Sequence, residues 1–111
     1  MAVGATIFQR TFQLAAGRET AYEFPVPYPG ILNVTAQGDV PFYIGVYTRA
    51  QYDQARAANP LRFPFMIGTA RSTHFLRNSI ESSGQYVVAF RVSGWSGGRT
   101  GSIQVVVQLT Q

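Results

Sequence analysis

The sequence contains no cysteine, no lysine, a single histidine and few charged residues of any kind. Without cysteine, the chain forms neither disulfide bonds nor thiolate metal sites. Charged residues make up 13% of the 111 residues, about half of the ~25% that is usual in soluble domains. The surface must therefore be covered largely by Gln, Thr, Ser and Gly, whose neutral groups cost less free energy to bury than ions do. Such a surface favours contact with protein partners, either copies of the same chain or a larger assembly.

All nine cationic side chains are arginines, and no two of them are adjacent. Nucleic-acid binding needs clustered cations with aromatic residues between them, so a net charge of +4 without a cluster does not favour this function. No run of about 18 apolar residues could span a membrane, and the opening MAVGATIFQRTF lacks the features of a secretory signal. We expect a protein that stays where it is made, or one domain of a longer chain. An extracellular site or a virion or surface assembly is favoured over a cytosolic monomer.

The segment Gly94–Gly98 fits the pattern G-x-S-x-G, which holds the nucleophilic serine of some hydrolases. In those enzymes a helix follows the serine, and the acid and histidine come later in the chain. Here a strand is predicted after Ser96, and residues 97–111 contain no Asp, Glu or His. The segment is better explained as a glycine-rich hairpin loop. The sole histidine, His74, is expected in a surface loop, and the five acids form no ligand set, so we predict no catalytic residue, no metal ligand and no cofactor.

Apolar and polar residues alternate along most of the chain, which is typical of β-strands. One short helix is predicted near residues 49–58, with Thr48 as its N-cap and Pro60 as its end. Some seven or eight strands indicate an all-β fold, a two-sheet antiparallel β-sandwich of jelly-roll or immunoglobulin-like type, in a single domain over residues 1–111. The predicted strands are IFQRTFQL, TAYEFPV, ILNVTAQ, VPFYIGVYT, LRFPFMIG, residues 73–76, QYVVAFRVS and SIQVVVQL.

A turn is predicted at Gln37-Gly38-Asp39, between ILNVTAQ and VPFYIGVYT, because Gly and Asp favour turns. The residues of these two segments that we expect in the core are Leu32, Val34, Ala36, Val40, Phe42, Ile44 and Val46.

Aromatic residues supply the candidate interaction site: Tyr43, Tyr47 and Tyr52, with Trp95 and Arg99 in the glycine-rich loop. Alternation places Tyr43 and Tyr47 on the face opposite the predicted core. An exposed pair of this kind can stack on sugar rings or anchor a protein partner, because both uses bury flat amphipathic rings. The alternative is that the sheet is covered on both sides, or that the tyrosines only stabilise cross-strand pairs.

The order of strands and turns resembles a family of small prokaryotic β-sandwich modules, which includes the pre-peptidase C-terminal domain and GOLD-like domains. The resemblance is carried by FQLAAGRETAYEFPV, GILNVTAQGDVPFYIGVYTRAQYDQ, SSGQYVVAFRVSG and GSIQVVVQL. It covers most of the chain but contains no chemical motif. It implies a non-catalytic accessory or interaction role, with no functional residues to carry over.

Two functions follow from these observations. The first is a non-catalytic structural or assembly protein, such as a virion decoration protein or a filament subunit. In that case a strand such as SIQVVVQL, if unpaired at a sheet edge, could pair with a neighbouring molecule. The alternative is an accessory binding module for glycan or peptide, of the pre-peptidase C-terminal type and attached to a secreted hydrolase.

Overall fold

The structure is a computed structural model that describes residues 5–15, 17–58, 66–92 and 100–110. The order of elements agrees with an all-β fold that includes one short helix. The elements are β1 (Ala5–Leu14), β2 (Glu19–Val26), β3 (Gly30–Thr48), α1 (Arg49–Ala58), β4 (Met66–Ile80), β5 (Gly84–Val92) and β6 (Gly101–Thr110).

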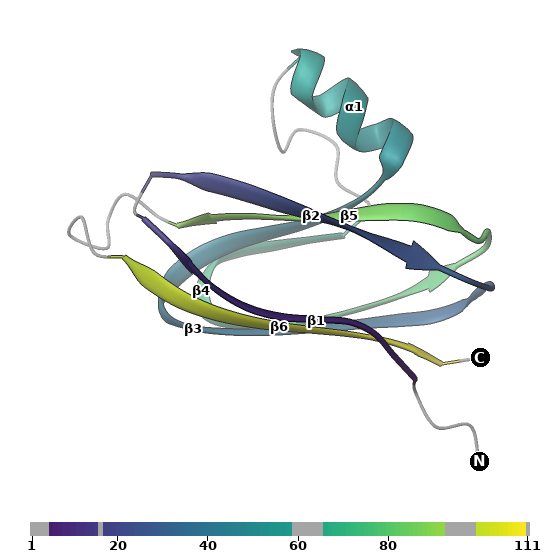
Figure 1. The fold of residues 1–111 in the computed structure, drawn as a ribbon, viewed down its shortest axis with the longest axis horizontal. Helices are drawn as coiled ribbons and strands as arrows, with labels where there is room; N and C mark the ends of the chain where they lie inside the picture. Colours follow the sequence, from purple (N-terminus) through teal and green to yellow (C-terminus); the bar gives the residue numbers. More distant parts are fainter. Residues whose placement is uncertain (1–4, 16, 59–65, 93–99, 111) are drawn as a thin grey trace.

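The strands are all antiparallel, in the order β1-β6-β3-β5-β2, with β4 paired to β3. The long strand β3 changes partner along its length. Residues 31–38 pair with β6, and residues 42–48 pair with β5. The sheet therefore folds over into two layers, with β1 and β6 in one and β2 and β5 in the other, while α1 lies outside the second layer (Figure 1).

The described residues form six strands in one near-barrel sheet, so the predicted strand number and the pair of separate sheets are not confirmed. Two pairs of predicted strands are in fact continuous. ILNVTAQ and VPFYIGVYT both belong to β3, and Met66 lies in the same strand as residues 73–76. Inside β3 the even-numbered residues from Leu32 to Val46 are buried, except for the half-buried Gly38, so inward side chains keep the same parity along the whole strand. The predicted turn at residues 37–39 is instead a bend with a register shift against β4.

The core lies between the two layers and consists of the residues that alternation points inward. All seven core positions predicted in β3 are buried, as are the inward residues of β5 and β6. Burial of one such aliphatic or aromatic side chain stabilises the fold by about 1.5–3 kcal/mol. Strand β6 lies between β1 and β3 and is hydrogen-bonded to both. The condition for strand addition at SIQVVVQL, an unpaired edge, is therefore not met.

Rings close the gap between the edge strands β1 and β2. Phe8 lies with its ring centroid 6.0 Å from that of Tyr22 and 5.8 Å from that of Phe24. Phe12 adds a second contact to Tyr22, at 5.2 Å, and the Arg10 guanidinium lies 4.5 Å from the Tyr22 centroid. Within the described residues, β1 pairs only with β6, and β2 pairs only with β5. These side-chain contacts therefore join the two layers where no backbone hydrogen bonds of the described strands do.

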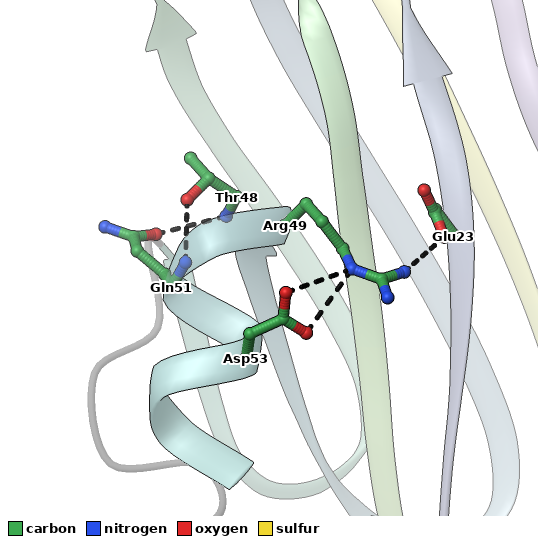
Figure 2. Close-up of polar contacts among 5 residues, drawn as sticks. All are labelled: Glu23, Thr48, Arg49, Gln51 and Asp53. Carbon is green, nitrogen blue, oxygen red and sulfur yellow. Dashed lines mark hydrogen bonds and ion pairs between the residues drawn. The ribbon is translucent and has the colours of Figure 1, made fainter. Parts of the chain in front are cut away.

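Helix α1 begins with a capping box, as the predicted N-cap implies. The Gln51 backbone N–H donates to Thr48 Oγ1, and the Thr48 N–H donates to Gln51 Oε1, both at 3.1 Å (Figure 2). Two N–H groups that lack partners within the helix are thus satisfied. Among the described residues, no helix has the length and apolar character needed to cross a membrane.

Candidate functional site

The folded sheet has two outer surfaces of different chemistry. We define the helix face as α1 together with the outward side chains of β2, β5 and residues 42–48 of β3. We define the polar face as the outward side chains of β1, β6, residues 30–39 of β3 and residues 72–79 of β4. Strands β1 and β6, which carry much of the polar face, lie in the layer farther from α1 (Figure 1). The central members of the polar face are Gln9, Thr11, Gln13, Asn33, Thr35, Gln37, Thr73, Phe75, Arg77, Ser102, Gln104, Val106 and Gln108.

Strand register arranges the polar face in rows that cross four strands. Thr11 lies beside Gln104, Gln104 beside Gln37, and Gln37 beside Thr73. With strands about 4.8 Å apart, this row of amides and hydroxyls extends about 14 Å. Within the described part of the chain, none of these four side chains makes a hydrogen bond to protein. The row therefore presents unused donors and acceptors on a rigid sheet.

A groove of about 480 Å³ follows this row and is lined by Thr11, Gln37, Gly38, Asp39, Thr73, Ser102 and Gln104. The Asp39 side chain is held in place, because its Oδ1 accepts a hydrogen bond of 2.8 Å from the Ser102 backbone N–H. Gly38 contributes backbone only. A Cβ at that position would point inward, 3.0 Å from Cε1 of Phe42.

Phe75 adds an apolar ring to this polar surface. It lies in the next row, which runs Gln9, Val106, Thr35 and Phe75, and 69% of it is exposed. Among the described residues, the other large exposed hydrophobic side chain is Tyr43, at 37%. Sequence reasoning missed Phe75, although Thr73, Phe75 and Arg77 share the odd-numbered positions opposite the buried His74. An aromatic residue at a polar position of the alternation was the available signal.

The predicted interaction residues are only partly brought together. Tyr43 is exposed as expected, but Tyr47 is fully buried, so the predicted exposed pair is wrong. Helix α1 packs over Tyr47, and the Tyr52 ring meets it edge-on with centroids 5.6 Å apart. The reading in which the sheet is covered on both sides is therefore correct at this position. Trp95 and Arg99 lie outside the described residues.

The Tyr47 hydroxyl is buried and has no hydrogen-bond partner among the described residues. Burial raises the pKa of Tyr47 to about 12, and the nearby Glu19 and Tyr52 add to the shift. The phenol therefore stays neutral at physiological pH. Its position suits it to packing rather than to contact with a ligand.

Charges on the helix face pair with one another. Arg49 Nη1 lies 2.5 Å from Glu23 Oε2, and its Nε lies 3.4 Å from Asp53 (Figure 2). Asp53, and next Glu23, raise the pKa of Arg49. Arg91 and Glu19 form a looser pair at 3.9 Å. All of these groups are about half exposed, so each pair contributes little to stability.

His74 lies in β4 and not in a surface loop, which corrects the sequence prediction. It is buried, its Nε2 is 2.8 Å from the Phe42 carbonyl oxygen, and its ring meets Phe42 edge-on at 4.6 Å. The ring therefore faces the core at the bend of β3. Ser96 lies outside the described residues, and the described ones contain no group of three or more His, Asp or Glu side chains that could hold a metal ion.

No protein-family model matches the chain, and no curated protein matches its sequence. Among solved structures, the fold is similar to the pre-peptidase C-terminal domain of a collagenase from Bacillus anthracis. The TM-score is 0.67 and the identity 10%, over 91% of this chain and 88% of that one.

The fold is also similar to PliG from Aeromonas hydrophila, a periplasmic inhibitor of g-type lysozyme. Here the TM-score is 0.64 and the identity 14%, over 96% of this chain and 88% of the other. Identities this low establish the fold alone. The resemblance to the pre-peptidase C-terminal domain, predicted from the order of strands and turns, is confirmed at that level.

Proposed function

We propose that this chain is a non-catalytic binding module that works outside the cytoplasm, with the polar face as its ligand-binding surface. The observation that carries the proposal is a groove of amides and hydroxyls that make no hydrogen bond within the described residues, beside a ring that is 69% exposed. The fold it shares with a collagenase domain and with a lysozyme inhibitor supports a binding role, and the periplasmic location of the inhibitor supports the compartment.

The physical case rests on the low cost of removing this surface from water. Neutral amides and hydroxyls lose less solvation energy on burial than ions do. Because Gln37 and Gln104 stand on strands that are paired on both sides, the backbone beneath them is already ordered, and only their side chains lose conformational freedom when a ligand binds. Phe75 supplies apolar area that a ligand can cover, as the central residues of binding sites commonly do.

An assembly role, as in a virion or filament, has less support. Such a role would use strand pairing between molecules at a free edge of SIQVVVQL. Strand β6, which contains this segment, is instead paired on both sides. Protein partners remain compatible with the binding role, since the neighbour PliG is itself an inhibitor of a protein.

The absence of native cysteine allows a direct test by protection of single engineered thiols. Gln104→Cys and Thr73→Cys place a thiol in the groove, and Ala50→Cys places a control thiol on the exposed start of α1. Each variant is alkylated alone and with soluble neutral polysaccharides, g-type lysozyme or gelatin. We expect at least one probe to slow alkylation at positions 104 and 73 by about tenfold while position 50 reacts unchanged. Protection at position 50 alone, or none with any probe, would contradict the proposal.

A further inference from the structure

We infer that the ligand of the polar face is a neutral polysaccharide, which lies along the groove and stacks one sugar ring on Phe75. This inference rests on the proposed function and names the ligand class of the same surface. It goes beyond the fold comparisons. Their identities of 10% and 14% establish the fold and say nothing about a ligand of this chain.

The charge of the groove indicates a neutral ligand. Among the described residues that line it, Asp39 is the one ionisable residue, and one of its oxygens already accepts a hydrogen bond from the Ser102 N–H. Arg77, on the same face, stands in a different row, beside Asn33. An anionic polymer would need clustered cations, and a cationic one would need several carboxylates. The described lining residues offer neither.

Hydrogen-bonding capacity matches that of sugar hydroxyls. Each Gln amide offers two donors and an acceptor, and each Thr hydroxyl donates and accepts. A sugar hydroxyl likewise does both, so it can contact two such side chains at once. Gln37, Gln104 and Thr11 have no protein hydrogen bond to give up within the described residues. Binding then exchanges water for ligand without breaking an internal contact.

The backbone of the groove argues against an extended peptide as the ligand. Gln37 and Gln104 stand on β3 and β6, each of which is flanked by hydrogen-bonded strands on both sides at these positions. A peptide that adds as a strand needs a free edge, where its backbone forms the bonds that give affinity. At Gln37 and Gln104, in the middle of the row, only side chains are available, and these suit a ligand whose polar groups are themselves hydroxyls.

The position of Phe75 also suits a sugar ligand. It lies one row from the groove, beside Thr35 and two residues from Thr73. An aromatic ring covers the apolar side of a flat partner and leaves the partner's polar groups free at its rim. A sugar ring has both features, with C–H groups on its faces and hydroxyls at its edge. Phe75 and the row of amides can therefore contact one ligand together.

The experiment is affinity electrophoresis of the full chain in native gels that contain neutral polysaccharides, followed by titration calorimetry with the best one. The variants are Phe75→Ala and the double variant Gln37→Ala/Gln104→Ala. Two controls match them on the helix face, Tyr43→Ala for the exposed ring and Gln85→Ala for the exposed amide. Circular dichroism checks that each variant is folded.

We expect retardation of the wild-type chain by at least one neutral polysaccharide. Affinity should fall about tenfold or more in Phe75→Ala and about five- to tenfold in the double glutamine variant. Both controls should bind as the wild type does. Loss in Phe75→Ala without loss in the glutamine variant would overturn the groove as the site and would place the ligand at the β4 edge.

Failure of the inference and failure of the proposed function give different results. If no neutral polysaccharide binds, or only charged ones do, while lysozyme or gelatin protects the thiol at position 104, the ligand class is wrong and the binding surface stands. If a polysaccharide binds and only Tyr43→Ala abolishes it, the surface itself is wrong and both proposals fall.

Discussion

The polar face and the helix face are built on the same sheet, and they differ in whether their side chains already have partners. On the helix face, Arg49 pairs with Glu23, and the rings of Tyr47 and Tyr52 meet beneath α1. On the polar face, Gln37 and Gln104 make no internal hydrogen bond within the described residues. A surface whose charges are already paired has fewer groups to offer a ligand. A surface with unused groups on a rigid support is available to a ligand, which is why we place binding there.

The largest expected effect is on the free energy of unfolding. It is tested by replacing a phenylalanine with alanine in each of two neighbouring strands, β3 and β4. Phe42→Ala removes a fully buried ring at the bend of β3, where both layers meet. We expect it to lower the free energy of unfolding by about 3–5 kcal/mol. Phe75→Ala removes a mostly exposed ring, and the unfolding free energy should change by less than about 0.5 kcal/mol. Urea denaturation measures both, and similar losses in the two variants would refute the assignment of Phe75 to a ligand surface.

A smaller expected effect is the dependence of stability on pH that the buried phenol of Tyr47 causes. An unfolded tyrosine titrates near pH 10, whereas the pKa of Tyr47 in the folded chain is raised to about 12. Between these values the folded state holds a proton that the unfolded state has lost, so stability falls as pH rises, by at most about 2–3 kcal/mol.

Tyr47→Phe isolates this contribution, because the other tyrosines are unchanged. We expect the variant to be at least as stable as the wild type at pH 9, since it removes a buried hydroxyl without a partner among the described residues. Its unfolding free energy should also decline less steeply than that of the wild type between pH 10 and 12. Parallel declines in guanidinium denaturation would mean that Tyr47 is accessible to solvent, and the contrast between the faces would weaken.

The smallest expected effect on stability concerns the helix cap at the start of α1, which we compare with an exposed threonine of the polar face. Thr48→Ala removes the hydroxyl that caps the Gln51 N–H, which should cost about 1 kcal/mol of stability. Thr73→Ala, a matched change of an exposed threonine on the polar face, should cost less than about 0.5 kcal/mol. Thermal denaturation of the two variants distinguishes them. Equal shifts would show that the threonine of the polar face also has a structural role.

Much of the fold could be predicted from the sequence, because strand alternation acts over short distances. The buried positions of β3, β5 and β6 and the cap of α1 follow from period and from local hydrogen bonding. The number of strands could not be predicted from alternation and local hydrogen bonding. Gly38 and Asp39 favour a turn locally, yet β3 continues through them because Gly38 pairs with Ile103 of β6. Long-range pairing outweighed the local preference.

The candidate site was harder to predict. Tyr43 and Tyr47 were placed correctly on one face, but the position of α1 over Tyr47 depends on tertiary packing. The groove was missed because its row joins residues as distant as Thr11 and Gln104. Register between strands is a property of the whole sheet, and no single segment contains it.

The sequence by itself determined which side chains face inward and which outward along each strand, since two-residue periodicity is a property of the local backbone. Only the tertiary structure decided which outward side chains stay exposed and which become neighbours. That depends on how β3 bends between the layers and on where α1 packs, and both are set by contacts between residues far apart in the chain. The covered Tyr47 and the row from Thr11 to Thr73 are the two results of that folding.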